Sequence, residues 1–216
     1  MARIMILGGH GKVALLAAPL LVERGHTVTS VFRNPAHEAD VVATGAQPVV
    51  VDIETLDVEQ LTNLLSGNDA VVWSAGAGGG DAARTYAVDR DAAVRTMDAA
   101  TAAGVPRYVM VSWLGSRADH GVPADDPFHA YADAKWAADE HLRSTGLEWT
   151  ILAPGGLTMD EPTGAIELDP RGRGSVSRAD VARVIVAAVE DPATAGRTIR
   201  FGGGDTPIED ALRNAR

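Results

Sequence analysis

Three polar side chains in the second half of the sequence have the types and spacing needed to move a proton. Ser112 ends a predicted strand over 108–111, and Tyr131 and Lys135 open the following predicted helix. Residues four apart lie on one face of a helix, so the phenol and the ammonium should point together. A nearby positive charge favours the phenolate, so Lys135 should lower the pKa of Tyr131 from its usual value of about 10. These residues predict a catalytic set in which Tyr131 is the acid/base, Lys135 its activator and Ser112 the residue that orients a substrate oxygen.

A glycine-rich loop lies near the start of the chain, between a predicted strand over 4–7 and a predicted helix over 13–24. Gly8 permits a tight turn, and Gly11 lets the backbone approach a phosphate closely. The phosphate would then meet free N–H groups and the positive end of the helix dipole. The alternative is a glycine turn that binds no ligand. The residues of this loop predicted to contact a cofactor are Gly8, His10, Gly11, Lys12 and Val13.

The end of the second predicted strand, over 27–32, distinguishes two dinucleotides. An acidic residue at this place suits the ribose hydroxyls of NAD, whereas an arginine suits the additional phosphate of NADP. The sequence has Arg33 here, whose planar guanidinium matches a phosphate, and Lys12 would add a second positive charge. An exposed arginine without a ligand is the alternative. The pattern predicts NADP, with NAD less favoured.

Further candidate cofactor contacts follow the third and fourth predicted strands, over 48–51 and 70–73. The carboxyl ends of parallel strands are where ligands bind in an open α/β sheet. Asp52 is expected either to accept a hydrogen bond from the adenine amino group or to cap a turn, and Lys135 also to bond the nicotinamide ribose. The predicted contacts are Asp52, Ile53, Ser74, Ala75 and Gly76.

The elements that would position these residues alternate between short apolar runs and longer amphipathic ones, as in βαβ units. Helices are predicted over 56–65, 81–103, 131–144 and 177–189, and further strands over 149–152 and 198–201. The stretch 153–176 is rich in proline and glycine and is predicted to be irregular. The sequence therefore predicts an α/β fold: a Rossmann doubly wound parallel sheet flanked by helices. It predicts one domain over residues 1–216, with a small C-terminal extension on the substrate side.

Composition excludes several classes of function. The 19 Lys and Arg against 29 Asp and Glu give a net charge of −10, which disfavours nucleic acid and anionic membranes as partners. The absence of cysteine excludes disulfides and thiolate chemistry, and the six histidines are not spaced as a metal site. With no targeting or membrane-spanning pattern, a cytoplasmic protein without metal is expected, as a monomer or homodimer.

The order of these motifs resembles the short-chain dehydrogenase/reductase superfamily. The segments 134–142 and 144–155 are similar to its atypical branch, which includes NAD(P)H-binding, NmrA-like proteins and the biliverdin reductase B/flavin reductase-like group. The resemblance implies that Pro154, Gly155 and Leu157 lie beside the nicotinamide. The chain departs from the pattern at Ala153, where relatives often carry arginine, and at Ala14, which replaces the last glycine.

Three functions remain open from the sequence. The first is an NADP-dependent oxidoreductase acting on a small carbonyl, quinone or related small-molecule substrate. The second is an epimerase or dehydratase that uses its cofactor transiently, although the short C-terminal region leaves little to bind a nucleotide-sugar. The third is a redox sensor that binds NADP(H) without turnover. The substrate pocket is expected from the irregular stretches 119–128 and 157–176.

Overall fold

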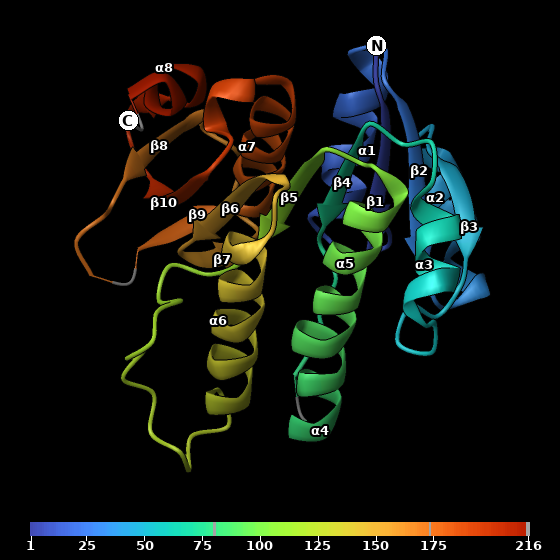
Figure 1. Ribbon diagram of the computed structural model, residues 1–216. Helices are drawn as coiled ribbons and strands as arrows, with labels where there is room; N and C mark the ends of the chain where they lie inside the picture. The colour runs from blue at the N-terminus through green and yellow to red at the C-terminus, as the bar shows by residue number, and fades with distance from the viewer. Residues whose placement is uncertain (80, 173, 215–216) are drawn as a thin grey trace.

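The computed structural model describes residues 1–79, 81–172 and 174–214 (Figure 1), and the other positions of the predicted 1–216 domain lie outside the described residues. Within the described part, a nine-stranded sheet has the order β11-β8-β10-β6-β5-β4-β1-β2-β3. The parallel strands are β3 (Gln47–Val50), β2 (Thr27–Phe32), β1 (Arg3–Leu7), β4 (Ala70–Trp73), β5 (Arg107–Val111), β6 (Glu148–Pro154) and β10 (Arg197–Gly203). The antiparallel strands β8 (Ala165–Leu168) and β11 (Thr206–Pro207) extend one edge.

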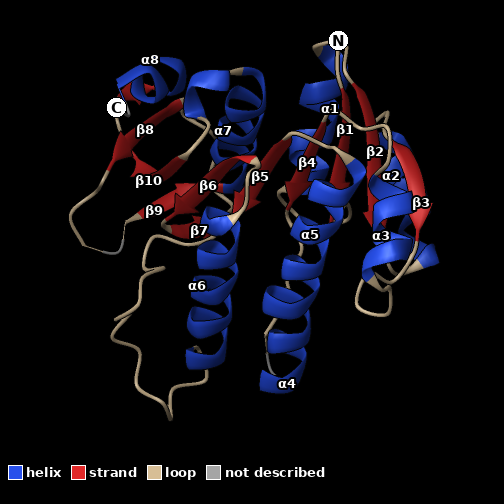
Figure 2. Cartoon of the chain, viewed as in Figure 1, coloured by secondary structure: helices blue, strands red, loops and turns tan. Residues whose placement is uncertain are grey.

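Helices cover both faces of this sheet (Figure 2). One face packs against α1 (Ala14–Glu23) and α7 (Arg178–Glu190), and the other against α3 (Val58–Leu65), α5 (Ala93–Ala103) and α6 (His129–Ser144). The shorter helices are α2 (Glu38–Ala43), α4 (Ala82–Thr85) and α8 (Ile208–Asn214). The predicted α/β doubly wound fold is confirmed, because each central strand is apolar on both faces, as a parallel sheet buried between helix layers requires.

The predicted helix over 81–103 is present but is not uniform. It begins as α4, continues as a π-helical segment over Tyr86–Ala92 and ends as α5. Asp81 caps its start by accepting hydrogen bonds from the N–H groups of Ala83 and Arg84. Such π-helical segments are frequent at functional sites, and this one places Asp89 in the interior.

The prediction that 153–176 is irregular is wrong in part. This stretch contributes β8, and it also contains β7 (Gly156–Thr158) and the start of β9 (Ser175–Ser177), which pair in a small separate parallel sheet. These strands are short and pair with partners distant in sequence, so local composition does not reveal them.

The chain reverses its direction across the sheet between β1 and β4. Strands β2 and β3 lie on one side of β1, and β4, β5 and β6 follow on the other. Ligands bind at such a switch point, outside the carboxyl ends of the strands. These ends lie toward the bottom of Figure 1, and the predicted site residues follow them in the chain.

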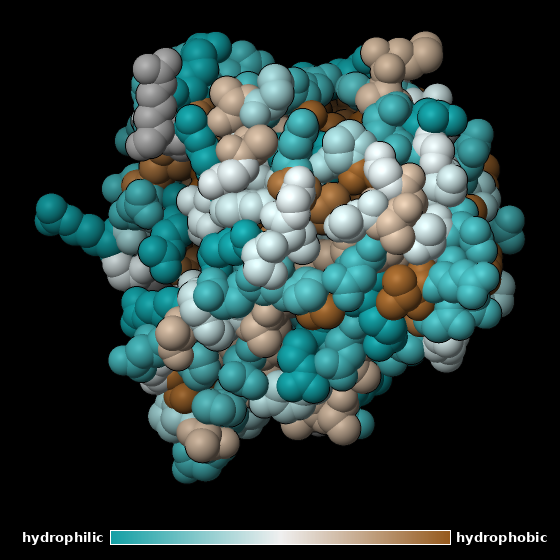
Figure 3. Space-filling model, in the orientation of Figure 1, coloured by the Kyte–Doolittle hydropathy of each residue, from teal (hydrophilic) through white to brown (hydrophobic). Residues whose placement is uncertain are grey.

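The face that carries α5 and α6 shows apolar residues scattered among polar ones (Figure 3). None of the helices in the described part of the chain has the length and apolarity to cross a membrane.

Candidate functional site

The glycine loop between β1 and α1 is packed so closely that only glycine fits at two positions. Gly8 has a φ of +87°, and a Cβ there would lie 2.5 Å from the Cα of Ala75. A Cβ on Gly9 would lie 2.5 Å from the Cβ of Ser30. The N–H groups of Gly8 and Gly9 both donate to the carbonyl of Val31, at 3.0 and 2.8 Å. The loop is therefore held between β2 and the segment that follows β4.

Helix α1 begins at this loop without a side-chain cap. Val13 is the N-cap residue, and its side chain is buried in the core, so only its backbone faces the loop. Gly11 donates to the carbonyl of Gly8 at 2.8 Å and closes the turn. An uncapped helix start presents unpaired N–H groups and a partial positive charge, which suits a phosphate.

A cleft of about 290 Å³ opens beside this loop, at the carboxyl ends of β1, β2 and β4. Most of the predicted cofactor contacts meet here; those that line the cleft are Gly8, His10, Gly11, Arg33, Asp52, Ile53, Ser74, Ala75 and Gly76. Lys12 is exposed beside them. The side chain of Asp52 accepts a hydrogen bond from the N–H of Glu54 at 3.1 Å, so it caps a turn while lining the cleft.

Two guanidinium groups share a single carboxylate in this cleft. Nη1 of Arg33 lies 3.4 Å from Oε1 of Glu54, and Nη2 of Arg84 lies 3.0 Å from the same oxygen. The side chain of Arg33 is 55% exposed, so it is available to a ligand. The sequence prediction missed Arg84 and Glu54, because their approach depends on how α4 and the turn after β3 fold together.

The cleft also contains a pair of stacked imidazole rings, of which the sequence predicted only one as a cofactor contact. The ring centroids of His10 and His37 are 3.6 Å apart, and the rings are inclined by 16°. His37 follows Arg33 in the short 3-10 helix Pro35–His37, capped by Asn34. His10 was predicted to contact a cofactor, whereas nothing in the pattern around His37 indicated that role.

A second cleft, of about 360 Å³, adjoins the first at Gly76, which lines both. Tyr131 lines this second cleft together with Phe128. Their rings are 5.0 Å apart, and the ring of Trp113 lies 5.0 Å from Phe128 and 6.4 Å from Tyr131. The predicted acid/base, Tyr131, therefore lies in an aromatic cluster beside the first cleft.

Lys135 lies in the interior rather than at the surface of the cleft. It is 1% exposed, and its ammonium donates to the carbonyl of Val111 at 2.6 Å. Burial lowers the pKa of Lys135, and the carboxylates of Asp89 and Asp139 oppose that effect.

The expected lowering of the Tyr131 pKa is wrong for this arrangement. Burial raises the pKa of Tyr131 well above its usual value, and the carboxylates of Asp89 and Asp139 raise it further. Negative charge on these two carboxylates disfavours a further negative charge on the phenol oxygen. Tyr131 is therefore held as a neutral phenol.

Ser112 is turned into the same interior. Its hydroxyl donates to Oδ2 of Asp139 at 2.5 Å, and the hydroxyl of Ser116 donates to the same oxygen at 2.6 Å. Burial raises the pKa of Asp139. Within the described residues, Oδ1 of Asp139 is buried without a hydrogen-bond partner. The sequence prediction missed Asp139, although its place four residues after Lys135 puts it on the same helical face.

The residues expected beside the nicotinamide lie at the end of β6. Pro154 and Gly155 are buried: the carbonyl of Pro154 accepts from the N–H of Leu114 at 2.8 Å, and the N–H of Gly155 donates to Phe201 at 2.8 Å. Leu157, on β7, is 37% exposed. These contacts hold the turn after β6 in place. Its contact with a nicotinamide stays a prediction.

The two adjoining clefts fit a dinucleotide. The close packing at Gly8 and Gly9 leaves no room for side chains where the backbone would approach a pyrophosphate. Two guanidinium groups share the single carboxylate of Glu54, so N–H donors remain for a phosphate. The fold and the clefts define a Rossmann-type nucleotide-binding protein.

Comparison with known proteins agrees with this class. The family model described as NAD(P)H-binding matches residues 8–192, and the chain belongs to that family. The predicted resemblance to atypical short-chain dehydrogenase/reductase proteins is confirmed at this level, and so is a nicotinamide cofactor, without a distinction between NAD and NADP.

The relatives match over nearly the whole chain. The chain is 31% identical to a Bacillus subtilis protein named uncharacterized sugar epimerase YhfK, across 98% of this chain and 99% of that protein. A solved structure described as a putative NAD-dependent epimerase/dehydratase from Bacillus halodurans is 31% identical, with a TM-score of 0.91, over 99% of this chain and 100% of that one. The oxidoreductase ylbE from Lactococcus lactis is 28% identical, with a TM-score of 0.85, over 98% and 95% of the two chains.

Proposed function

We propose that this chain is an NADP-dependent oxidoreductase that reduces a small carbonyl- or quinone-containing substrate. The observation that carries the proposal is the shared wall at Gly76. A dinucleotide bound in the first cleft would extend past Gly76 toward the second cleft, where Tyr131 and its aromatic neighbours lie. The name of the relative ylbE, an oxidoreductase, is consistent with this activity.

The preference for NADP rests on the charges at the end of β2. Arg33 is half exposed and contacts one carboxylate, which it shares with Arg84. An arginine fork binds a phosphate through two parallel hydrogen bonds, so the additional phosphate of NADP would gain contacts that NAD cannot make.

The chemistry divides between the cofactor and the chain. The bound nicotinamide supplies a hydride. Tyr131 donates a hydrogen bond, and then its proton, to the substrate oxygen; its raised pKa keeps the phenol protonated, which suits the reductive direction. Phe128 lines the second cleft beside Tyr131, and the ring of Trp113 packs against both, so the surroundings of the phenol ring are apolar.

Lys135 and Ser112 act as positioning residues in this proposal. The hydrogen bond from Lys135 to Val111 ties α6 to the end of β5, and the bond from Ser112 to Asp139 ties the following loop to the same helix. Together they hold Tyr131 against the second cleft. The ammonium of Lys135 has three donors, and Val111 takes one of them. A contact with the nicotinamide ribose, as the sequence predicts, would require the ribose to reach this buried ammonium.

The test is the Tyr131→Phe variant, which removes the hydroxyl and keeps the ring. Turnover in a panel of carbonyl and quinone substrates should fall about 100-fold or more, while NADPH affinity stays within twofold. Full activity in the variant would contradict the role of Tyr131. Tight NADPH binding by wild type without turnover of any substrate would favour the redox sensor instead.

A second candidate, an epimerase or dehydratase, is favoured by the names of two relatives. Such an enzyme returns its hydride to the product and leaves the cofactor unchanged. Incubation with sugar nucleotides, followed by product analysis and by absorbance of the reduced cofactor, separates the two. New sugar isomers without net cofactor oxidation would support the second candidate.

A further inference from the structure

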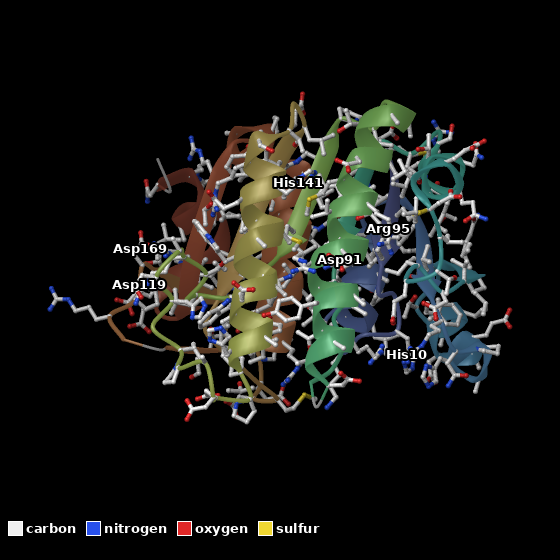
Figure 4. All side chains as sticks on the ribbon, turned by 60° about the horizontal axis from the view of Figure 1, so that its bottom comes forward. His10, Asp91, Arg95, Asp119, His141 and Asp169 are labelled. Carbon is white, nitrogen blue, oxygen red and sulfur yellow. The ribbon has the colours of Figure 1, made fainter. Side chains whose placement is uncertain are left out.

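The stacked pair of His10 and His37 brings together two titratable rings from separate segments of the chain. His10 belongs to the glycine loop and His37 to the turn after β2, and both line the dinucleotide cleft with Arg33 and Asn34. The centroid separation of 3.6 Å is direct face-to-face contact. Figure 4 labels His10 toward the lower edge of the molecule.

Each ring has a different hydrogen-bond partner. Nε2 of His10 lies 2.9 Å from Oδ2 of Asp40, so a proton on His10 is balanced by a carboxylate. Nε2 of His37 lies 3.4 Å from Nδ2 of Asn34. The N–H of Ala36 donates to Oδ1 of Asn34, which fixes the amide so that its NH₂ group faces His37. Because that NH₂ group can only donate, His37 accepts and carries no proton on Nε2.

Charged groups surround the pair. Two imidazolium rings stacked face to face repel one another, and Asp40 balances only one of them. Within the described residues His37 has no carboxylate partner and only Asn34 at its Nε2, so a second proton calls for a further anion beside His37. The charged groups near the pair are Lys12 of the glycine loop, Arg33 at the end of β2, Glu38 and Asp40 of α2, and Asp52, Glu54 and Arg84 of the same cleft.

We propose that His10, His37 and Arg33 form the binding site for the 2′-phosphate of NADP, and that the histidine pair takes up a proton when this phosphate binds. The inference rests on the proposed preference for NADP. The dianionic phosphate supplies the missing anion, the Nε2 atom of His37 exchanges its bond with Asn34 for an N–H donated to a phosphate oxygen, and Arg33 donates from the side.

The proposal predicts proton-coupled binding that is specific to NADPH. Calorimetric titration of the full chain at pH 7.5, in two buffers of different ionisation enthalpy, gives the number of protons taken up. At this pH the phosphate is itself a dianion. We expect about half to one proton per NADPH and almost none per NADH, with NADPH affinity falling about 3- to 10-fold per pH unit above neutrality.

A matched variant locates the proton. His37→Gln should abolish the uptake and weaken NADPH binding, and leave NADH binding within twofold. His141→Gln is the control, because His141 is also paired with an aspartate, at 2.7 Å from Asp98, but lies on α6, away from His10 (Figure 4). Uptake that persists in His37→Gln, or is lost in His141→Gln, would overturn the assignment to this pair.

The wild-type measurement also separates failure of this inference from failure of the proposed function. If NADPH binds more tightly than NADH without proton uptake, the histidine pair is wrong and the NADP preference stands. If the two cofactors bind equally, or neither binds, both proposals fail.

Discussion

Two arginines at opposite ends of the parallel strands have opposite surroundings. Arg107 begins β5, is 6% exposed, and donates to the hydroxyls of Thr150 and Thr194 and to the carbonyls of Glu148 and Ala188. Burial lowers its pKa to about 10. Arg33 follows β2 at the other end, is 55% exposed and has one carboxylate at 3.4 Å.

The difference separates stability from binding. Nη1 and Nη2 of Arg107 donate to acceptors in β6, in α7 and in the turn before β10, so its side chain ties these segments together. Its Nε is buried without a hydrogen-bond partner within the described residues. The donors of Arg33 face a cleft and share a single carboxylate, so a phosphate can replace or extend that contact. Matched buried donors contribute to folding, whereas incompletely matched donors at the switch point contribute to recognition.

The largest expected effect tests the structural role of Arg107. Arg107→Ala removes the four hydrogen bonds that the guanidinium donates to two hydroxyls and two carbonyls, and it opens a buried space. It should reduce the free energy of unfolding by about 3 kcal/mol or more, measured by urea unfolding. The folded variant should bind NADPH and NADH in the wild-type ratio. A changed ratio would mean that Arg107 also acts on the cofactor site.

A smaller expected effect tests the role of Arg33 in phosphate binding. Glu54→Gln removes the carboxylate that both Arg33 and Arg84 contact, so it raises the positive charge that a phosphate meets. NADPH should bind about 3- to 10-fold more tightly, with a smaller change for NADH, in a fluorescence titration. Weaker NADPH binding in this variant would mean that Glu54 positions the arginines rather than competing for them.

The smallest expected effect concerns Asp139, which is buried like Arg107 but has one unpaired oxygen within the described residues. The raised pKa of Asp139 means that the folded state binds more protons than the unfolded state between an unfolded pKa of about 4 and the higher folded value. Asp139 therefore makes wild type lose stability as pH rises through that window. Asp139→Asn removes this contribution, and its amide oxygen still accepts from Ser112 or Ser116. Unfolding at several pH values should show the variant gaining on wild type as pH rises; a constant difference would contradict the assignment.

The sequence predicts the parts of the site that depend on local geometry. The glycine loop, Arg33 and the residues after β3 and β4 lie where strand ends must bring them, because strand order and handedness follow from the βα alternation. Tyr131 reaches the second cleft for the same reason.

Parts that depend on how side chains pack across elements could not be predicted. Lys135 shares a helical face with Tyr131, but that face is buried, so its ammonium donates to the carbonyl of Val111 and feels the charges of two buried carboxylates rather than activating the phenol. Asp139 is a polar residue on a predicted helix, and nothing in the sequence indicates that Ser112 and Ser116 donate to its carboxylate. His37 and Arg84 line the cleft from a short 3-10 helix and from the short helix α4. Elements this short show no hydrophobic periodicity in the sequence.

The most direct test of the central claim is the affinity of the chain for NADPH and NADH, measured in wild type and in Arg33→Ala. We predict that wild type binds NADPH more tightly, and that the variant loses about 10- to 100-fold in NADPH affinity with NADH affinity within twofold. Equal wild-type affinities, or equal losses for the two cofactors in the variant, would contradict the assignment of Arg33 to the 2′-phosphate.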